Sequence, residues 1–292
     1  MKGIILAAGK GSRLYPTSLA VNKQLMPIYD KPMIYYPLTT LIENGINEIC
    51  IICNPEALSG FKDLLGDGSR FGIKIVYKVQ REPKGIADAF IIAKSFLRKT
   101  DGVTLILGDN VFYGASDVLR QAFLDFSSGA TIFGYKVHDP ERYGVVEFDK
   151  DGKALSIEEK PKRPKSNYAV PGFYIFGSDV IDIAENLKPS KRGELEITDV
   201  IKVYLSNDSL RVSKLPRGTA WLDAGTCDSF YESSSYVQTI EKRQGVKIGC
   251  PEEAGYRNDF ITKTQFKKIV KQMPDSDYRD YLKKVLKNEE ES

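Results

Sequence analysis

The first half of the chain alternates short apolar runs with amphipathic stretches. Apolar runs bounded by glycine or polar residues predict buried strands at residues 3–7, 48–53, 73–79 and 103–107. Between them, apolar residues recur with helical spacing at about 33–44, 56–65 and 86–98. Strands separated by helices in this order are typical of βαβ units. The pattern therefore predicts an α/β fold with a Rossmann-like, mostly parallel sheet flanked by helices.

The pattern changes in the middle of the chain. Residues from about 130 to 176 hold several short β-rich segments without long helices between them, and we expect this extension to enclose a second substrate. Helical spacing returns at 179–187, 196–205 and 227–243, and a lysine-rich tail from about 262 to 287 predicts one or two amphipathic helices. We expect a core of residues 1–245, which includes the extension, and a C-terminal helical appendage at 246–292.

Composition narrows the classes of partner. The 42 basic and 39 acidic residues are interspersed and leave a net charge of only +3, which gives no support for a nucleic-acid or membrane-surface partner. No apolar run approaches the roughly 20 residues that a membrane-spanning helix needs. The N-terminus enters a predicted strand at once and does not have the pattern of a signal peptide. We therefore expect a cytoplasmic protein.

Cysteine and histidine offer little chemistry. Cys50 and Cys53 form a nominal C-x-x-C, but they lie in a β-branched run in which alternate residues face opposite ways, and no second pair accompanies them. We expect both to be small core residues. The single histidine, His138, excludes a multi-histidine metal site. Catalysis would therefore depend on carboxylates, lysine and arginine, with or without a metal ion.

A glycine-rich loop follows the first predicted strand. Gly9 and Gly11 allow the backbone to turn sharply and to bring N–H groups close to phosphate oxygens. Arg13 adds a permanent cation with bidentate geometry. Leu14 stands where the dinucleotide-binding pattern requires a third glycine, and the Walker pattern is absent. The loop predicts a triphosphate-binding site, with an ordinary strand-to-helix turn as the alternative.

Two aspartates follow apolar segments, in L-I-L-G-D and in A-W-L-D. In open α/β sheets ligands bind outside the carboxyl ends of strands, so Asp109 and Asp223 are candidate ligands there. Each alone is more often a turn or cap residue. Mg²⁺ takes one or two carboxylates together with phosphate oxygens. Beside a triphosphate loop, the pair predicts a Mg²⁺ site.

Two further polar segments are candidates. Lys23 and Gln24 follow the glycine loop closely enough to reach the same phosphates, although a loop lysine is often only a solvated charge. The E-E-K-P segment ends another predicted strand. Strand alternation there places Glu158 and Lys160 on one face and Glu159 on the other. The spacing does not settle which acid points inward.

The order of several long motifs carries a resemblance. G-x-G-S-R-L, K-Q-L-M-P-I-Y-D-K-P, L-G-D-N, E-R-Y-G-V-V-E-F-D, E-E-K-P, R-G-E-L-E-I-T-D-V and W-L-D-A-G-T occur in turn between Lys2 and about Arg257. Together they closely resemble the glucose-1-phosphate thymidylyltransferase family. The resemblance implies Mg²⁺-dependent transfer from dTTP to glucose 1-phosphate, giving dTDP-glucose and pyrophosphate. It also implies a homotetramer and a first step toward dTDP-deoxysugars such as dTDP-rhamnose.

The resemblance also assigns roles to residues. Catalysis falls to Arg13, Lys23, Asp109 and Asp223, with the two aspartates holding Mg²⁺ and the two cations stabilising the departing pyrophosphate. Nucleotide binding falls to Leu6, Ala8, Gly9, Gly11, Ser12, Arg13, Lys23, Gln24, Gln80, Pro83, Gly85 and Asp109. Sugar-phosphate binding falls to Asn110, Tyr143, Gly144, Glu159, Lys160, Val170 and Tyr174, with Glu159 on sugar hydroxyls and Lys160 on the phosphate. A regulatory nucleotide site would use Arg217, Lys247, Glu253 and Arg257.

Some positions depart from the family pattern. Ala8 and Lys10 replace the usual glycine and serine of the loop, and Pro171 replaces a threonine beside the sugar residues, where it cannot donate a backbone hydrogen bond. The segment after Gly114 lacks the usual histidine and glutamate, which bears on feedback inhibition. One rival is a UTP-using enzyme, since burying the thymine methyl contributes only about 0.8 kcal/mol. A rival of another class is a non-catalytic nucleotide-binding regulatory subunit.

Overall fold

A parallel sheet forms the N-terminal half of the molecule. The computed structural model describes the backbone of residues 1–291 and the side chains of residues 1–288. Four neighbouring strands run parallel in the order β5 (Lys74–Val79), β4 (Glu48–Cys53), β1 (Lys2–Ala7) and β6 (Gly102–Leu107). The helices between them are α1 (Tyr35–Glu43), α2 (Leu58–Leu65) and α3 (Asp88–Leu97). The βαβ prediction is confirmed, with boundaries within about two residues of those expected.

The β-rich extension continues this sheet and does not form a separate one. In chain order its strands are β8 (Ala130–Lys136), β9 (Gly144–Phe148), β10 (Ala154–Glu159), β11 (Tyr168–Ala169) and β12 (Phe173–Gly177). β12 pairs antiparallel with β6 and β8, and the others follow outward in the order β11, β9, β10. β13 (Leu210–Lys214) runs parallel to β8. Within the described residues, these strands make one mixed ten-stranded sheet.

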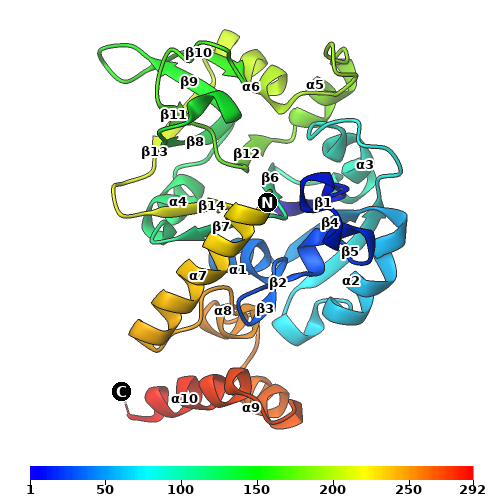
Figure 1. The fold of residues 1–292 in the computed structure, drawn as a ribbon, viewed down its shortest axis with the longest axis vertical. Helices are drawn as coiled ribbons and strands as arrows, with labels where there is room; N and C mark the ends of the chain where they lie inside the picture. The colour runs from blue at the N-terminus through cyan, green and yellow to red at the C-terminus, as the bar shows by residue number, and fades with distance from the viewer. Residues whose placement is uncertain (292) are drawn as a thin grey trace.

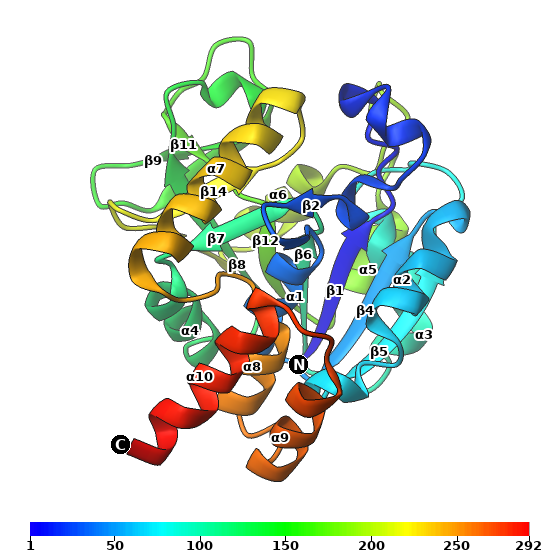
Figure 2. The same cartoon turned by 60° about the horizontal axis from the view of Figure 1, so that its bottom comes forward.

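Shorter elements complete the fold around the sheet. β7 (Asn110–Tyr113) pairs antiparallel with β14 (Ala220–Asp223), and β2 (Pro27–Ile28) pairs with β3 (Lys31–Pro32). The remaining helices before residue 245 are α4 (Ser116–Leu124), α5 (Val180–Asn186), α6 (Ile197–Ser206) and α7 (Cys227–Gln244). Figure 2 shows the N-terminal loop and the β9–β11 extension on opposite sides of one end of the molecule.

The sheet buries apolar side chains on both faces. Ile5 and Cys53 belong to one hydrophobic cluster and Ile4 and Cys50 to the other, because neighbouring residues of a strand point to opposite faces. Both cysteines are fully buried, and burial raises the pKa of the Cys50 thiol to about 12. The prediction that they are core residues is confirmed.

Three helices follow residue 245 in the part of the chain that the structure describes. α8 (Pro251–Arg257) packs closely on the core, because a Cβ on Gly255 would lie 2.2 Å from the Phe71 carbonyl oxygen. The tail, for which one or two amphipathic helices were predicted, forms two, α9 (Lys263–Gln272) and α10 (Asp277–Glu291). They share a small cluster around Phe266 and Leu282. Figure 1 shows this pair at the end of the molecule opposite β9 and β10.

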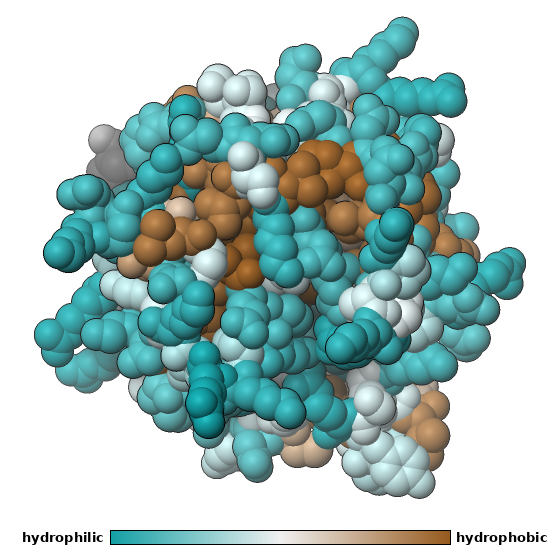
Figure 3. Space-filling view, turned by 90° about the horizontal axis from the view of Figure 1, so that it is seen from above, coloured by the Kyte–Doolittle hydropathy of each residue, from teal (hydrophilic) through white to brown (hydrophobic). Residues whose placement is uncertain are grey.

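The surface is mixed in character. Seen from the end that carries β10 and α6, apolar side chains gather in an irregular band with hydrophilic side chains around them (Figure 3). Among the helices of residues 1–291, none combines the length and the apolar character needed to cross a membrane.

Candidate active site

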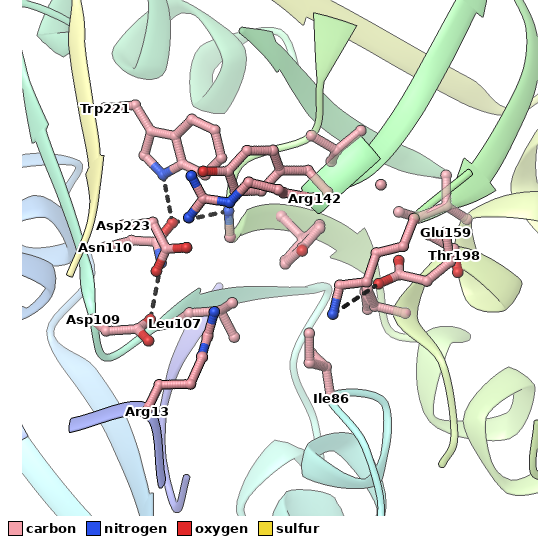
Figure 4. A pocket seen from close by; sticks show the side chains of 18 residues that line it. Arg13, Ile86, Leu107, Asp109, Asn110, Arg142, Glu159, Thr198, Trp221 and Asp223 are labelled. Atoms are coloured by element: carbon pink, nitrogen blue, oxygen red, sulfur yellow. Dashed lines mark hydrogen bonds and ion pairs between the residues drawn. The ribbon is translucent and has the colours of Figure 1, made fainter. Parts of the chain in front are cut away.

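One cavity of about 480 Å³ is lined by residues of the N-terminal loop, of the β7–β14 pair and of the β-rich extension. Arg13, Asp109, Asn110 and Asp223 belong to the loop and to the region of the β7–β14 pair, and the residues from the extension are Tyr143, Gly144, Glu159, Lys160, Val170 and Tyr174. All seven residues predicted for sugar-phosphate binding therefore face the same space as three of the four predicted catalytic residues. Figure 4 shows Arg13 and Asp109 on one side of this space and Glu159 across it.

The glycine-rich loop lies directly after β1. Gly11 adopts the left-handed conformation (φ 63°), and a Cβ there would lie 3.2 Å from Cβ of Ser18, so a larger residue would be strained. Ala8 is buried and is not among the residues with positive φ, so the Cβ that distinguishes it from glycine is tolerated. The side chain of Lys10 is exposed. The departure at position 8 therefore leaves the loop backbone intact.

The two aspartates meet through the β7–β14 pair. Asp223 lies opposite Asn110 in the register, and the N–H of Ala224 donates to the Asp109 carbonyl oxygen at 3.1 Å. The Lys23 ammonium forms an ion pair with the Asp109 carboxylate, and the two side chains are only 10% and 13% exposed. Lys23 is not among the residues that line the cavity, but it contacts Asp109, which is.

The electrostatic states of the two aspartates differ. Burial alone would raise the pKa of Asp109, but the Lys23 ammonium and a hydrogen bond from Asn110 outweigh it and lower that pKa. Burial, together with the Asp109 charge, raises the pKa of Asp223 to about 6. Arg13 offsets this only in part. The pair therefore holds negative charge that a further cation would stabilise.

These residues fit a hard divalent cation that is also held by substrate oxygens. Within the described residues, no three His, Cys, Asp or Glu side chains are arranged to hold a metal ion by themselves. Two adjacent carboxylates are enough for Mg²⁺, which keeps water or phosphate oxygens in its remaining positions. Asp109 and Asp223 could supply that pair.

Glu159, and not Glu158, faces the cavity. Burial raises the pKa of Glu159, and its carboxylate lies 3.8 Å from Lys160 Nζ and 3.9 Å from Arg192 Nη2. The strand has ended at Lys160, whose φ is 43°, so Lys160 lines the same cavity as Glu159. This settles the alternation that the sequence left open.

Two buried polar atoms at the site lack a hydrogen-bond partner. Thr198 Oγ1 is one, in a residue that is 2% exposed and lines the cavity. Gln24 Oε1 is the other, and the Gln24 side chain reaches Gly108 just before Asp109. A buried polar atom without a partner is costly, so both atoms are suited to receive a ligand group.

The residues predicted for the nucleotide base lie beyond the lining of this cavity, at the carboxyl ends of β1 and β5. Gln80 Nε2 donates to Asp88 Oδ2 at 2.8 Å, and Gly85 has a φ of 97°. The Leu195 N–H donates to the Lys84 carbonyl oxygen at 2.7 Å, which ties this loop to the segment before α6. Pro83 is exposed, and Leu6 lies in β1.

Sequence reasoning missed several residues that line the cavity, among them Arg142, Thr198 and Trp221. Trp221 could have been found, because it lies two positions before Asp223 on one strand and therefore shares its face. Arg142 precedes the predicted Tyr143 and stacks over its ring at 5.3 Å. Thr198 lies in the R-G-E-L-E-I-T-D-V motif, but neither its residue type nor its spacing singles it out within that motif.

A second cavity of about 330 Å³ collects most of the predicted regulatory residues. Lys247, Glu253 and Arg257 line it, together with Asp117 and Arg120 of α4. These two residues lie in the segment where the family pattern has a histidine and a glutamate. Arg217 does not line this cavity and lies exposed in the turn before β14.

Comparison with known proteins agrees with the resemblance that the sequence motifs carry. A family model described as "Nucleotidyl transferase" matches residues 2–240. A glucose-1-phosphate thymidylyltransferase of Mycolicibacterium smegmatis is 51% identical over 289 residues, which cover 99% of this chain and 100% of the relative. The enzyme of the same name from Neisseria meningitidis is 50% identical, over 98% of this chain and 100% of its own length.

Solved structures agree in fold. A Bacillus anthracis protein assigned as a glucose-1-phosphate thymidylyltransferase superimposes with a TM-score of 0.75 and 41% identity, covering 81% of this chain and 94% of its own. A UDP-glucose pyrophosphorylase superimposes with a TM-score of 0.71 at 22% identity, covering 82% of this chain and 98% of its own. At that identity the second likeness shows the fold alone.

Proposed function

Since the chain belongs to the nucleotidyl transferase family and shares about half of its residues with full-length relatives of one enzyme name, we propose that it transfers the thymidylyl group of dTTP to glucose 1-phosphate. The products are dTDP-glucose and pyrophosphate. The single cavity that joins the phosphate-loop arginine and two aspartates to Glu159 and Lys160 is the observation that carries this proposal. Both substrates must meet in one space for a direct transfer.

The phosphate loop and its cations bind the triphosphate. The two substrates bring a charge of about −6, and each pair of like charges at ~4 Å repels by several kcal/mol in a partly dry site. Arg13 and Lys23 offset this charge, and their cations stabilise the negative charge that moves onto pyrophosphate. To reach the phosphates, Lys23 exchanges part of its contact with Asp109 for phosphate oxygens. The ion pair thus keeps Lys23 in place before the substrate binds.

Asp109 and Asp223 would hold Mg²⁺, which when bound neutralises the α-phosphate and so favours attack on it. The raised pKa of Asp223 supports this assignment, because a carboxylate that is destabilised by its neighbour gains most from an added cation. By holding this cation, the same carboxylates would keep the α-phosphate in position for the sugar phosphate. Catalysis then consists of positioning and electrostatic stabilisation.

The extension positions the sugar phosphate. Glu159 accepts hydrogen bonds from sugar hydroxyls, and the partnerless Thr198 hydroxyl beside Gly144 offers another polar contact. Lys160 holds the phosphate whose oxygen attacks the α-phosphorus in line. Asn110, Tyr143, Val170 and Tyr174 complete the wall. No covalent enzyme intermediate is required.

The loop residues at β1 and β5 read the base. Gln24 Oε1 needs a donor, which the N3–H of thymine can supply, and Gln80 and Gly85 lie at the end of the neighbouring strand β5. Ala8, Gly9, Gly11 and Ser12 present backbone N–H groups to the phosphates. Leu6 and Pro83 are assigned to the apolar edge of this pocket.

The proposal extends to regulation and assembly. We assign catalysis to residues 1–245 and the second cavity, with Lys247, Glu253 and Arg257, to feedback control in a homotetramer whose partner supplies the exposed Arg217. The function places the protein in the cytoplasm, where nucleoside triphosphates are made, at the first step toward dTDP-deoxysugars such as dTDP-rhamnose. Added dTDP-rhamnose should lower the rate, and an unchanged rate would remove the regulatory assignment.

The function is tested by pyrophosphate release. Purified protein with MgCl₂, dTTP and glucose 1-phosphate should release pyrophosphate and form dTDP-glucose, whereas omission of the metal should stop the reaction. Replacing dTTP with UTP tests base selection, for which the methyl group alone supplies about fourfold. Binding of dTTP without pyrophosphate release would favour the non-catalytic alternative.

A further inference from the structure

The Asn110 side-chain amide is held by three hydrogen bonds. Its Oδ1 accepts from Trp221 Nε1 at 2.6 Å and from the Gly172 backbone N–H at 3.0 Å. Its Nδ2 donates to Asp109 Oδ1 at 2.9 Å. Figure 4 labels Trp221, Asn110 and Asp109 and draws hydrogen bonds as dashed lines. Asn110 is 2% exposed and Trp221 9% exposed, so these bonds are sheltered from water.

The chemistry of the partners fixes the orientation of this amide. The Trp221 indole and the Gly172 backbone nitrogen can only donate, so the atom that meets both of them must be the amide oxygen. The amide nitrogen then faces Asp109 and donates to its carboxylate. Rotating the amide by half a turn would oppose donors to donors and leave Asp109 without this contact.

Close packing holds both donors in place. A Cβ on Gly172 would lie 2.6 Å from Leu107 Cδ1 and 2.9 Å from Asn110 Oδ1, so a larger residue would displace one of these side chains. The Trp221 ring lies 4.9 Å from the Tyr143 ring and 5.6 Å from the Tyr135 ring, measured between centroids. The two tyrosine rings therefore hold the indole with its N–H toward Asn110, and the Tyr143 ring also lines the cavity.

We propose that Trp221 is a positioning residue that orients the Asp109 carboxylate through Asn110. This inference rests on the proposed function. In addition to its own backbone N–H, two side chains hold the Asp109 carboxylate, namely Asn110 at Oδ1 and Lys23 at Oδ2. When Lys23 turns to phosphate, the Trp221–Asn110 contact is what still fixes the carboxylate for its cation. Trp221, in the wall of the proposed sugar site, and Asp109, at the proposed metal site, are thereby connected by hydrogen bonds through Asn110.

Trp221→Phe tests the contact, because it keeps an aromatic ring and removes the indole donor. We expect the Mg²⁺ concentration for half-maximal rate to rise about fivefold and kcat to fall by a similar factor, the contribution of one buried hydrogen bond. The KM for dTTP should stay within about twofold. The matched control is Tyr135→Phe, which removes the hydrogen bond from the Tyr135 hydroxyl to Thr219 and leaves the Trp221 contact intact. It should behave as the wild type.

A second readout does not depend on turnover. Trp221 is the only tryptophan of the chain, so indole emission reports the surroundings of this one side chain, which include the contact with Asn110. With dTTP present and no sugar phosphate, added Mg²⁺ should change the emission of the wild type, and Asn110→Ala should lose most of that response while still binding dTTP in equilibrium dialysis.

The outcomes separate the two proposals. Equal Mg²⁺ requirements for the wild type and Trp221→Phe would overturn the positioning role, as would an equal or absent emission response in the wild type and Asn110→Ala. A wild-type protein that releases no pyrophosphate would instead overturn the proposed function, and the emission titration would then decide the positioning role by itself.

Discussion

Replacing Asp223 by asparagine should stabilise the metal-free protein and abolish turnover. Burial and the charge of Asp109 raise the pKa of Asp223 from 3.8 to about 6, so the ionised carboxylate is disfavoured in the folded state. At neutral pH, the difference corresponds to a cost of up to about 3 kcal/mol, at 1.36 kcal/mol per pKa unit. Asparagine keeps the size of the side chain and removes this cost.

The pH dependence has a definite sign. The folded-state pKa of Asp223 lies above its unfolded value, so binding of a proton to Asp223 favours the folded state. This contribution is fully present below about pH 4 and is lost as the pH rises through about 6. At pH 7.5 with EDTA, Asp223→Asn should therefore raise the free energy of unfolding by about 1–3 kcal/mol, or Tm by roughly 2–6 °C. Near pH 4 the two proteins should be equally stable.

Asp109→Asn is the matched comparison and should have the opposite effect. Its carboxylate is paired with the buried Lys23 ammonium, so removing the charge leaves that cation uncompensated and should cost about 3 kcal/mol at pH 7.5. Urea denaturation at both pH values measures these changes, and pyrophosphate release measures turnover. An Asp223→Asn protein that is less stable than the wild type at pH 7.5, or that keeps a near-normal rate, would refute the reasoning.

The remaining predictions concern the sugar side, the catalytic lysine and the base-side loop. Lys160→Ala should raise the KM for glucose 1-phosphate by about tenfold or more, since a charge-assisted contact contributes about 1.5–3 kcal/mol, and equal effects on both substrates would contradict this. Lys23→Ala should lower kcat about 100-fold or more. It should also lower the free energy of unfolding at neutral pH, because Asp109 loses its buried partner. A variant with wild-type stability and activity would contradict both roles of Lys23. Gly85→Ala should lower the free energy of unfolding by about 2–4 kcal/mol, because φ is 97° and a Cβ would lie 2.4 Å from the Leu195 carbonyl oxygen, and thermal melting at wild-type temperature would contradict it.

Much of the fold follows from periodicity. The strands β1, β4 and β6 are continuous apolar runs bounded by polar or glycine residues, so their limits could be read within a residue or two. The way in which the extension joins the sheet could not, because an antiparallel strand such as β12, buried on both faces, has the same apolar pattern as a parallel one. Only long-range pairing distinguishes them.

The sequence also indicated some residues of the candidate site and not others. Arg13 and Asp109 were marked by their position just after strands, and the structure places both on one cavity. Arg192 and Thr198 have no such mark. Their neighbours reveal them, since Arg192 lies 3.9 Å from the Glu159 carboxylate and Thr198 carries a buried hydroxyl without a partner. Contacts between distant segments are set by the packing of α6 against the extension, which no local pattern encodes.

The most direct test of the central claim is a matrix of pyrophosphate-release rates across nucleoside triphosphates and sugar 1-phosphates, with and without Mg²⁺. We expect the highest kcat/KM for dTTP with glucose 1-phosphate, lower values for UTP and for other sugar phosphates, and no release without the metal. Pyrophosphate release from none of the pairs, or the fastest release from a pair that contains neither dTTP nor glucose 1-phosphate, would contradict the account.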